Sequence, residues 1–201
     1  MVPGWLQSNK KYSTGEEYNL NVTGNQSVIY DLTVVDAFDT VLVWEQKQIE
    51  KAVGGPSEMA KLDTLEEGVY YKCITPSTRP DSTFTDGDKL YVNYVCRRLL
   101  DNKAVDSNIK DTCKVIDPYS SGRSYEPLLV NYASDYTEMT MTESESKMIS
   151  GFARAIYSMK PYEKGIVYMT SQYGYQDSGQ GSDIPAVCPL VFELELTDAP
   201  E

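Results

Sequence analysis

Near the C-terminus of this 201-residue chain, residues 173–184 form an aromatic, glycine- and amide-rich segment whose side chains could bind a ligand. Tyrosine has a large apolar face and a hydroxyl tip, so one side chain can both pack against a ligand and hydrogen-bond it. The polar Gly/Gln/Ser surroundings of Tyr175 are unusual for a core residue and favour a functional role. With 16 Tyr against 4 Phe, the whole composition is consistent with a binding surface.

Several other kinds of chemistry are excluded by residue type. The chain contains no His, which rules out His triads, His general bases and His-ligated haem. The four cysteines are widely spaced: Cys73, Cys96, Cys113 and Cys188. Without a Cys-x-x-Cys pair a zinc site is not expected, and free, buried thiols are the simpler expectation for a chain of this size. Residues 179–181 do not open a helix after a strand, which argues against a dinucleotide-binding site. Residues 86–88 lack the remaining ligands of a calcium loop. We therefore expect no metal and no cofactor.

The charge balance limits the class of partner. Lys plus Arg number 18 and Asp plus Glu 30, giving a net charge of −12, which argues against nucleic acid or an anionic membrane as partner. No apolar run is long enough to predict a membrane-spanning segment, and residues 1–11 lack the apolar core of a signal peptide. At 41% apolar and 24% charged residues, the chain has the composition of one large or two small folded domains.

The elements around the aromatic segment follow from periodicity and turn residues. The stretch 148–198 predicts a short helix at 151–159, a strand, the aromatic loop and a final strand. Upstream we predict a helix at 39–53 capped by Asp39 or Thr40, strands at 68–75, 89–100 and 136–141, and the start of a strand at 103–107. Residues 54–66 are expected to form a polar linker and 108–135 a loop-rich segment.

Parts of the C-terminal stretch recur near the N-terminus. Residues 1–5 match 148–152, and residues 27–37 match 189–199, in the same order. The early copy lacks the aromatic loop. We interpret residues 1–40 as a partial, degenerate repeat without an active site of its own.

Taken in order, the motifs between Gly68 and Asp198, about two-thirds of the chain, resemble FKBP-type peptidyl-prolyl isomerases. The matching pieces are GVYYKC at 68–73, DGDKLYVNYVCRRLL at 86–100, Val-Asp-Ser at 105–107, MISGFARAIYSMKPYEKGIVYM at 148–169, Tyr-Gly-Tyr at 173–175, Ile-Pro at 184–185 and PLVFELELTD at 189–198. The helix and linker ahead of Gly68 are also similar to those of FKBP-like envelope proteins of Bacteroidetes.

The resemblance implies an α+β fold, an antiparallel sheet wrapped around a short central helix. It places an isomerase domain at 67–201 with an insertion at 108–135, preceded by a linker helix and loop at 41–66 and the partial repeat at 1–40. It further implies a periplasmic or cell-envelope location.

The resemblance also implies the site residues. As catalytic residues it implies Tyr175, Asp106 and Phe152, and as substrate-binding residues Tyr94, Val105, Met148, Ile149, Ile184 and Phe192. Phe152 would form the pocket floor, Tyr175 would donate its hydroxyl, and Ile149 its backbone N–H, to the substrate. Asp106 would lie at the rim and hydrogen-bond Tyr94. In the absence of any function, Tyr94, Phe152 and Phe192 would still be expected in a core.

The chemistry of proline isomerisation suits these residue types. The peptide bond must twist against roughly 20 kcal/mol of resonance, a step that needs no nucleophile, metal or proton relay. The twisted amide is less polar than the planar one, so an apolar aromatic pocket stabilises it. The implied substrates are proline-containing polypeptides in unfolded or folding proteins, and macrolides are implied as inhibitors.

Departures from the family pattern keep two alternatives open. Val105 replaces the usual aromatic, Gly174 and Gln176 replace Ala and Gly beside Tyr175, and Ala186 replaces a second proline. The 108–135 insertion could cover the pocket, form a partner surface or pack beside the sheet. Either Tyr136 or Met139 could stand for the aromatic that precedes the helix. Val105 and the insertion favour weak activity or a non-catalytic chaperone or binding module. A structural envelope component, in which the tandem repeats mainly supply surfaces, is the other alternative to an isomerase.

Overall fold

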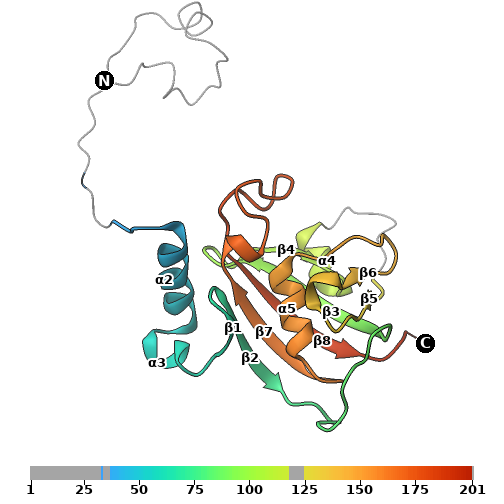
Figure 1. Ribbon diagram of the computed structural model, residues 1–201. Helices are drawn as coiled ribbons and strands as arrows, with labels where there is room; N and C mark the ends of the chain where they lie inside the picture. The colour runs from blue at the N-terminus through green and yellow to red at the C-terminus, as the bar shows by residue number, and fades with distance from the viewer. Residues whose placement is uncertain (1–32, 34–36, 118–124, 201) are drawn as a thin grey trace, which may run out of the picture. The chain divides into compact units, whose positions relative to one another are not determined.

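The computed structural model describes residues 33, 37–117 and 125–200 (Figure 1). The predicted partial repeat at 1–40 lies outside this part of the chain except for 33 and 37–40. The helices are α2 (Val41–Val53), α3 (Pro56–Met59), α4 (Lys110–Ile116) and α5 (Ser150–Ser158), with 3-10 turns η2 (Tyr136–Glu138) and η3 (Ser171–Tyr173). The strands are β1 (Asp63–Glu66), β2 (Val69–Thr75), β3 (Lys89–Arg98), β4 (Ala104–Ser107), β5 (Leu128–Asn131), β6 (Thr140–Met141), β7 (Lys164–Met169) and β8 (Leu190–Thr197).

The strands form one antiparallel sheet in the order β1-β2-β7-β8-β3-β5-β6, with β4 paired to β3 off this path. Strands β3 and β8 pair along eight residues, from Tyr91 opposite Thr197 to Arg98 opposite Leu190. Helix α5 lies across one face of the sheet (Figure 1). The antiparallel sheet and the short central helix predicted from the sequence are both present.

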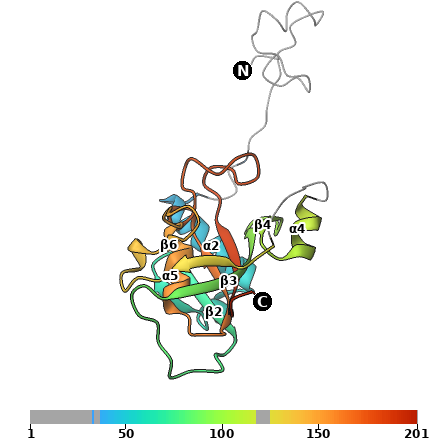
Figure 2. The ribbon, with the colours of Figure 1, turned by 90° about the vertical axis from the view of Figure 1, so that its right-hand side faces the viewer.

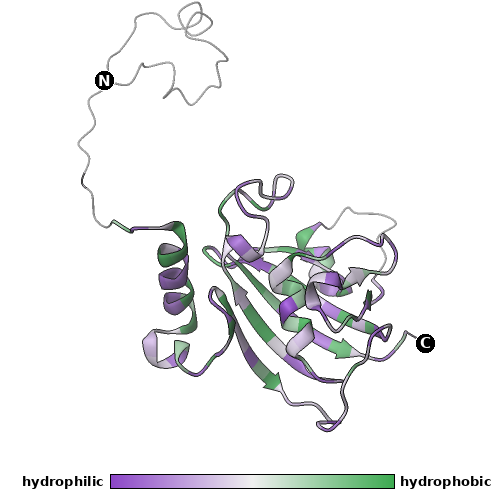
Figure 3. Ribbon diagram, in the orientation of Figure 1, coloured by the Kyte–Doolittle hydropathy of each residue, from purple (hydrophilic) through white to green (hydrophobic). Residues whose placement is uncertain are grey.

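Side chains along each strand point alternately to the two faces of the sheet, and both faces bury apolar residues. In β8 every second residue is buried, beginning at Leu190, and these residues join the core around α5. Figure 3 shows hydrophobic residues recurring along the strands of the sheet. Because successive side chains point to opposite faces, Tyr70, Tyr168 and Val191 face the other way. There they form a second cluster with Ile49 of α2. Helices α2 and α5 thus cover opposite faces of one sheet.

Helix α2 begins and ends as its sequence predicts. The Thr40 hydroxyl accepts a hydrogen bond from the Val43 N–H, and Gly54 adopts the left-handed conformation that ends many helices. Ile49 is fully buried, and so is Glu45 one turn earlier on the same face. Burial of a carboxylate at such a position costs free energy unless a hydrogen-bond donor or a cation pairs with it.

Residues 54–66 differ from the polar linker that we expected. They form α3 and then β1, which pairs with β2 and extends the same sheet. A four-residue strand is too short for its alternation to be distinguished from loop sequence. The domain boundary at residue 67 remains a prediction.

The 108–135 segment also holds more structure than the sequence indicated. It contains α4 and β5, and β5 pairs with β3 and β6. Buried Asn108 fixes its start: its side-chain amide donates to the Val92 and Glu126 carbonyls at 2.8 and 3.2 Å, and its oxygen accepts from the Tyr94 N–H at 2.9 Å. The strand predicted at 136–141 is instead η2 followed by the short β6.

All four cysteines are free, as expected, but Cys73 is exposed whereas the other three are buried. Cys73 lies where the outer half of β2 leaves the core, so the burial expected for it was wrong. None of the described helices is both long and apolar enough to cross a membrane. The connection at 76–88 and the loop after η3 extend from opposite ends of the sheet (Figures 1 and 2).

Candidate active site

A cavity of about 120 Å³ opens between α5, β3, β8 and the loop after η3. We call it the aromatic pocket; it is lined by Tyr94, Asp106, Leu128, Met141, Met148, Ile149, Phe152, Tyr175 and Phe192. Seven of these nine residues are among those implied by the sequence. They come from segments far apart in the chain, which only the folded sheet brings together.

Three aromatic rings from three different elements pack against one another in the pocket. The rings of Phe152 and Phe192 lie 5.1 Å apart at 70°, and those of Tyr94 and Phe152 lie 5.9 Å apart at 86°. Such edge-to-face contacts are the favoured geometry for aromatic pairs. Phe152 and Phe192 are buried, so their rings give the pocket a rigid apolar base.

The start of α5 brings a backbone donor to the same place. Ile149 is the N-cap residue, and its carbonyl accepts from the Phe152 and Ala153 N–H groups at 3.1 Å. Gly151 lets the helix approach β7 closely, because a Cβ there would lie 2.7 Å from the Met169 sulfur. Within the described part of the chain, the Ile149 N–H has no hydrogen-bond partner, so it is available to a ligand.

Tyr94 and Asp106 form the polar edge of the pocket. The Tyr94 hydroxyl donates to Asp106 Oδ2 at 2.8 Å, as the resemblance implied. The other Asp106 oxygen accepts from the Ser107 N–H at 2.9 Å, and the Ser107 hydroxyl donates to the Tyr94 carbonyl at 2.7 Å. These bonds tie β3 to β4 and orient the tyrosine ring against Phe152.

Tyr175 reaches the pocket from the loop after η3. The Gln176 N–H donates to the Ser171 carbonyl at 2.9 Å, which closes the turn around Tyr175. Burial raises the pKa of Tyr175 above its usual value, and the nearby Cys96 and Asp106 raise it further. The hydroxyl therefore stays protonated at neutral pH. It makes no hydrogen bond to any described residue and can donate one to a ligand.

Two of the implied residues lie elsewhere. Val105 and Ile184 are buried in the core around α5 and do not line the pocket. Valine is too short to extend a wall from β4 as an aromatic would. Ile184 faces inward beside its backbone bridge to Gln180.

Leu128 and Met141 complete the lining instead, and no motif in the sequence pointed to them. Leu128 comes from β5, so the described part of the 108–135 segment supplies one wall residue of the pocket. Neither candidate for the aromatic before the helix lies in the lining. Met139 is in the core, and Tyr136 packs on Tyr157 with ring centres 6.1 Å apart.

The arrangement suits binding and distortion of a ligand better than bond-making chemistry. The pocket offers a protonated hydroxyl, a free backbone N–H and apolar rings, with one carboxylate at its edge. Among residues 37–117 and 125–200, no three Cys, Asp or Glu side chains converge as a metal site requires.

Comparison with known proteins decides the family. The model of FKBP-type peptidyl-prolyl cis-trans isomerases matches residues 81–197, more than half of the chain. The chain belongs to this family. FK506-binding protein 1 of Aspergillus oryzae is 32% identical over 130 residues, which cover 64% of this chain and 96% of that protein. The FKBP domain catalyses the cis–trans isomerisation of X-Pro peptide bonds, so its substrates are proline-containing peptides.

Solved structures agree with this FKBP assignment at the level of fold. The N-terminal domain of FKBP42 from Arabidopsis thaliana superposes with a TM-score of 0.50 at 17% identity, covering 70% of this chain and 93% of that one. A peptidyl-prolyl cis-trans isomerase from Pseudomonas syringae gives a TM-score of 0.49 at 23% identity, covering 84% and 100%. The superposition with the FKBP42 domain shows the FKBP-like α+β fold, with its antiparallel sheet and short helix.

Proposed function

We propose that isomerisation takes place in the aromatic pocket, with the proline ring held against Phe152. The observation that carries this proposal is the convergence of Tyr94, Phe152 and Phe192 around one cavity that also contains the Tyr175 hydroxyl. An apolar base removes water from the amide and favours the less polar twisted state. A cavity of about 120 Å³ suits a single side chain.

Two donors orient the substrate in this proposal. The Ile149 N–H and the Tyr175 hydroxyl each donate to a carbonyl that flanks the proline, so that rotation occurs about one bond while its neighbours stay fixed. Asp106 acts through Tyr94, whose ring it holds at the pocket edge. We therefore assign Asp106 as a positioning residue and Tyr175 as the catalytic one.

A protease-coupled assay on a proline tetrapeptide tests the activity itself. We expect a rate above the uncatalysed background that is abolished by heat denaturation. A folded protein that gives only the background rate would contradict the proposed site and favour a non-catalytic binding module.

A double-mutant cycle tests the role of Asp106. Asp106→Ala and Tyr94→Phe each remove the hydrogen bond between these residues, so each should lower kcat/KM about threefold. If Asp106 acts through Tyr94, the double variant should lose little more than either single variant. Losses that multiply would assign Asp106 a separate contact with the substrate.

We further propose unfolded or folding proteins as the natural substrates and macrolides as inhibitors. The related Aspergillus protein is named for binding FK506, and macrolides of that class are candidates for the same pocket. Titration of the tetrapeptide assay with FK506 tests this. Refolding of a protein limited by proline isomerisation tests the substrate class, since catalysis should shorten its slow phase.

The cell-envelope location, the relation to Bacteroidetes proteins and the partial repeat at 1–40 also remain proposals. They rest on the sequence resemblance and on the matches of 1–5 to 148–152 and of 27–37 to 189–199. Fractionation of the source cells tests the location. Deletion of residues 1–36 should leave kcat/KM unchanged if the repeat carries no active site.

A further inference from the structure

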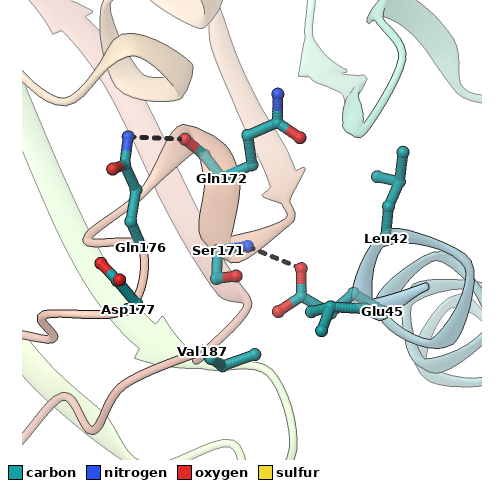
Figure 4. A pocket seen from close by; sticks show the side chains of 8 residues that line it. Leu42, Glu45, Ser171, Gln172, Gln176, Asp177 and Val187 are labelled. Atoms are coloured by element: carbon teal, nitrogen blue, oxygen red, sulfur yellow. Dashed lines mark hydrogen bonds between the residues drawn. The ribbon is translucent and has the colours of Figure 1, made fainter.

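A second cavity, of about 410 Å³, lies between α2 and the loop after η3 (Figure 4). We call it the α2 cleft; its described lining is Val41, Leu42, Glu45, Ser171, Gln172, Gln176, Asp177 and Val187. It shares no residue with the aromatic pocket. The isomerase mechanism gives it no role.

Glu45 is the unusual residue of this cleft. Its side chain reaches from α2 to the loop, where Oε2 accepts a hydrogen bond from the Ser171 N–H at 2.8 Å (Figure 4). Glu45 is 1% exposed, and Oε1 has no hydrogen-bond partner among the described residues. A buried carboxylate satisfied at only one oxygen lacks the second donor that its burial requires.

The rest of the lining indicates which donor would suit it. The described lining contains two carboxylates, Glu45 and Asp177, and neither Lys nor Arg. Val41, Leu42 and Val187 supply apolar surface beside the carboxylates, while Gln172 and Gln176 add amides. A cation on a short hydrocarbon stem matches this combination of negative charge and apolar wall.

We propose that the α2 cleft binds the ammonium or guanidinium group of an alkyl cation, either a free amine or the side chain of a lysine or arginine in a polypeptide. The cation donates to Glu45 Oε1 while Oε2 keeps its bond to Ser171. Asp177, at the exposed side of the cleft, adds attraction, and the apolar residues pack on the stem.

The cleft lies on the other side of the turn that carries Tyr175. The Ser171 N–H donates to Glu45 Oε2, and the Ser171 carbonyl accepts from the Gln176 N–H. The Gln176 carbonyl in turn accepts from the Val187 N–H at 2.8 Å. Tyr175 lines the aromatic pocket, and its neighbour Gln176 lines the cleft. The backbone amides of Ser171 and Gln176 therefore report directly on an occupant.

The test is a ¹⁵N–¹H NMR titration of the full chain with two cations, agmatine and Nα-acetyl-arginine methylamide, and with n-butanol as the uncharged control. We expect saturable shifts of the Ser171 and Gln176 amides with the cations only. Saturation by agmatine alone would identify free amines as the source, and saturation by both would include arginine side chains. No saturable shift with either cation, or equal shifts with n-butanol, would overturn the proposal.

Three variants assign the binding to named carboxylates. Glu45→Gln keeps an acceptor for the Ser171 N–H but removes the charge, and should weaken agmatine binding roughly tenfold or more. Glu50→Gln removes a carboxylate of α2 outside the lining and should bind as the unchanged protein does. Wild-type affinity in Glu45→Gln would overturn the proposal.

Asp177→Asn keeps the test decisive if Glu45→Gln fails to fold. Asp177 is exposed, so its replacement should not disturb the fold. We expect about twofold to fivefold weaker agmatine binding, and unchanged affinity in a folded Asp177→Asn protein would also overturn the proposal. The tetrapeptide assay does not depend on these titrations. Absence of cation binding would therefore not contradict isomerisation in the aromatic pocket, and absence of isomerase activity would not contradict cation binding.

Discussion

The aromatic pocket and the α2 cleft lie on two sides of one loop but follow opposite physical rules. The pocket, about 120 Å³, is built from buried rings and keeps its polar groups neutral or at the edge. The cleft is larger, about 410 Å³, and contains a buried carboxylate with an unsatisfied oxygen. The larger cavity is not the one suited to proline chemistry. Lining chemistry, more than volume, distinguishes a site that twists an amide from one that selects a cation.

The largest effect should come from removing the ring of Phe152, which forms the floor of the aromatic pocket. Phe152→Ala should lower kcat/KM on the order of 100-fold and the free energy of unfolding by about 3–5 kcal/mol, since it deletes a buried ring that touches Tyr94 and Phe192. The measurements are the tetrapeptide assay and urea denaturation.

Phe84→Ala is the matched control for this loss. Phe84 packs on Tyr132 with ring centres 5.5 Å apart, outside the pocket lining. It should cost stability but leave kcat/KM of the folded protein unchanged. Equal loss of activity in both variants would mean that general loosening of the fold, and not the pocket floor, explains the effect.

The next effect concerns the donor on the shared loop. Tyr175→Phe removes a hydroxyl without a described partner, so kcat/KM should fall about tenfold while the free energy of unfolding changes by less than about 0.5 kcal/mol. Tyr173→Phe, in the adjacent η3 turn and outside the lining, serves as the control and should keep full activity. An active Tyr175→Phe enzyme would transfer the donor role to Ile149 alone.

Salt should have a smaller effect, and it should weaken cation binding in the α2 cleft without changing turnover in the aromatic pocket. Between about 0.01 M and about 1 M salt the screening length falls from about 30 Å to about 3 Å. Agmatine binding to the cleft should weaken severalfold over this range because Asp177 is exposed. Turnover of an uncharged tetrapeptide in the aromatic pocket should stay within about twofold. A parallel response of both quantities would contradict the assignment of charge to the cleft.

The smallest effect is that of pH on the pocket. The pKa of Tyr175 lies above its ordinary value of 10.0, so its donor contribution is complete below pH 10 and is lost only as pH rises through the raised pKa. We expect kcat/KM to be flat between about pH 6 and about pH 9. A decline in this range that Tyr175→Phe abolishes would show that the pKa of Tyr175 lies below its ordinary value, and would contradict this expectation.

Most residues of the aromatic pocket could be predicted from the sequence because they lie in recognisable motifs. Phe152 and Ile149 stand in the Ile-Ser-Gly-Phe turn, whose Gly151 is required by the close approach to Met169. Tyr175 stood out because its loop is polar. Leu128 belongs to a four-residue strand that has no pattern of its own, so nothing local could place it in the lining.

Glu45 is a residue whose burial the sequence itself indicates. Its spacing from Leu42 and Ile49, three and four residues, puts it on the apolar face of α2. A charge at such a position predicts a buried partner. The partner itself, the Ser171 N–H, lies 126 positions along the chain and follows only from the fold.

The place of β2 in the sheet has a practical consequence. The family match begins at residue 81, yet β2, at 69–75, lies between β1 and β7. A protein trimmed to the matched residues would leave the backbone groups of β7 unpaired along an apolar edge, which is the usual template for aggregation. A fragment of this isomerase intended for expression therefore has to begin ahead of residue 69, so that it includes β2.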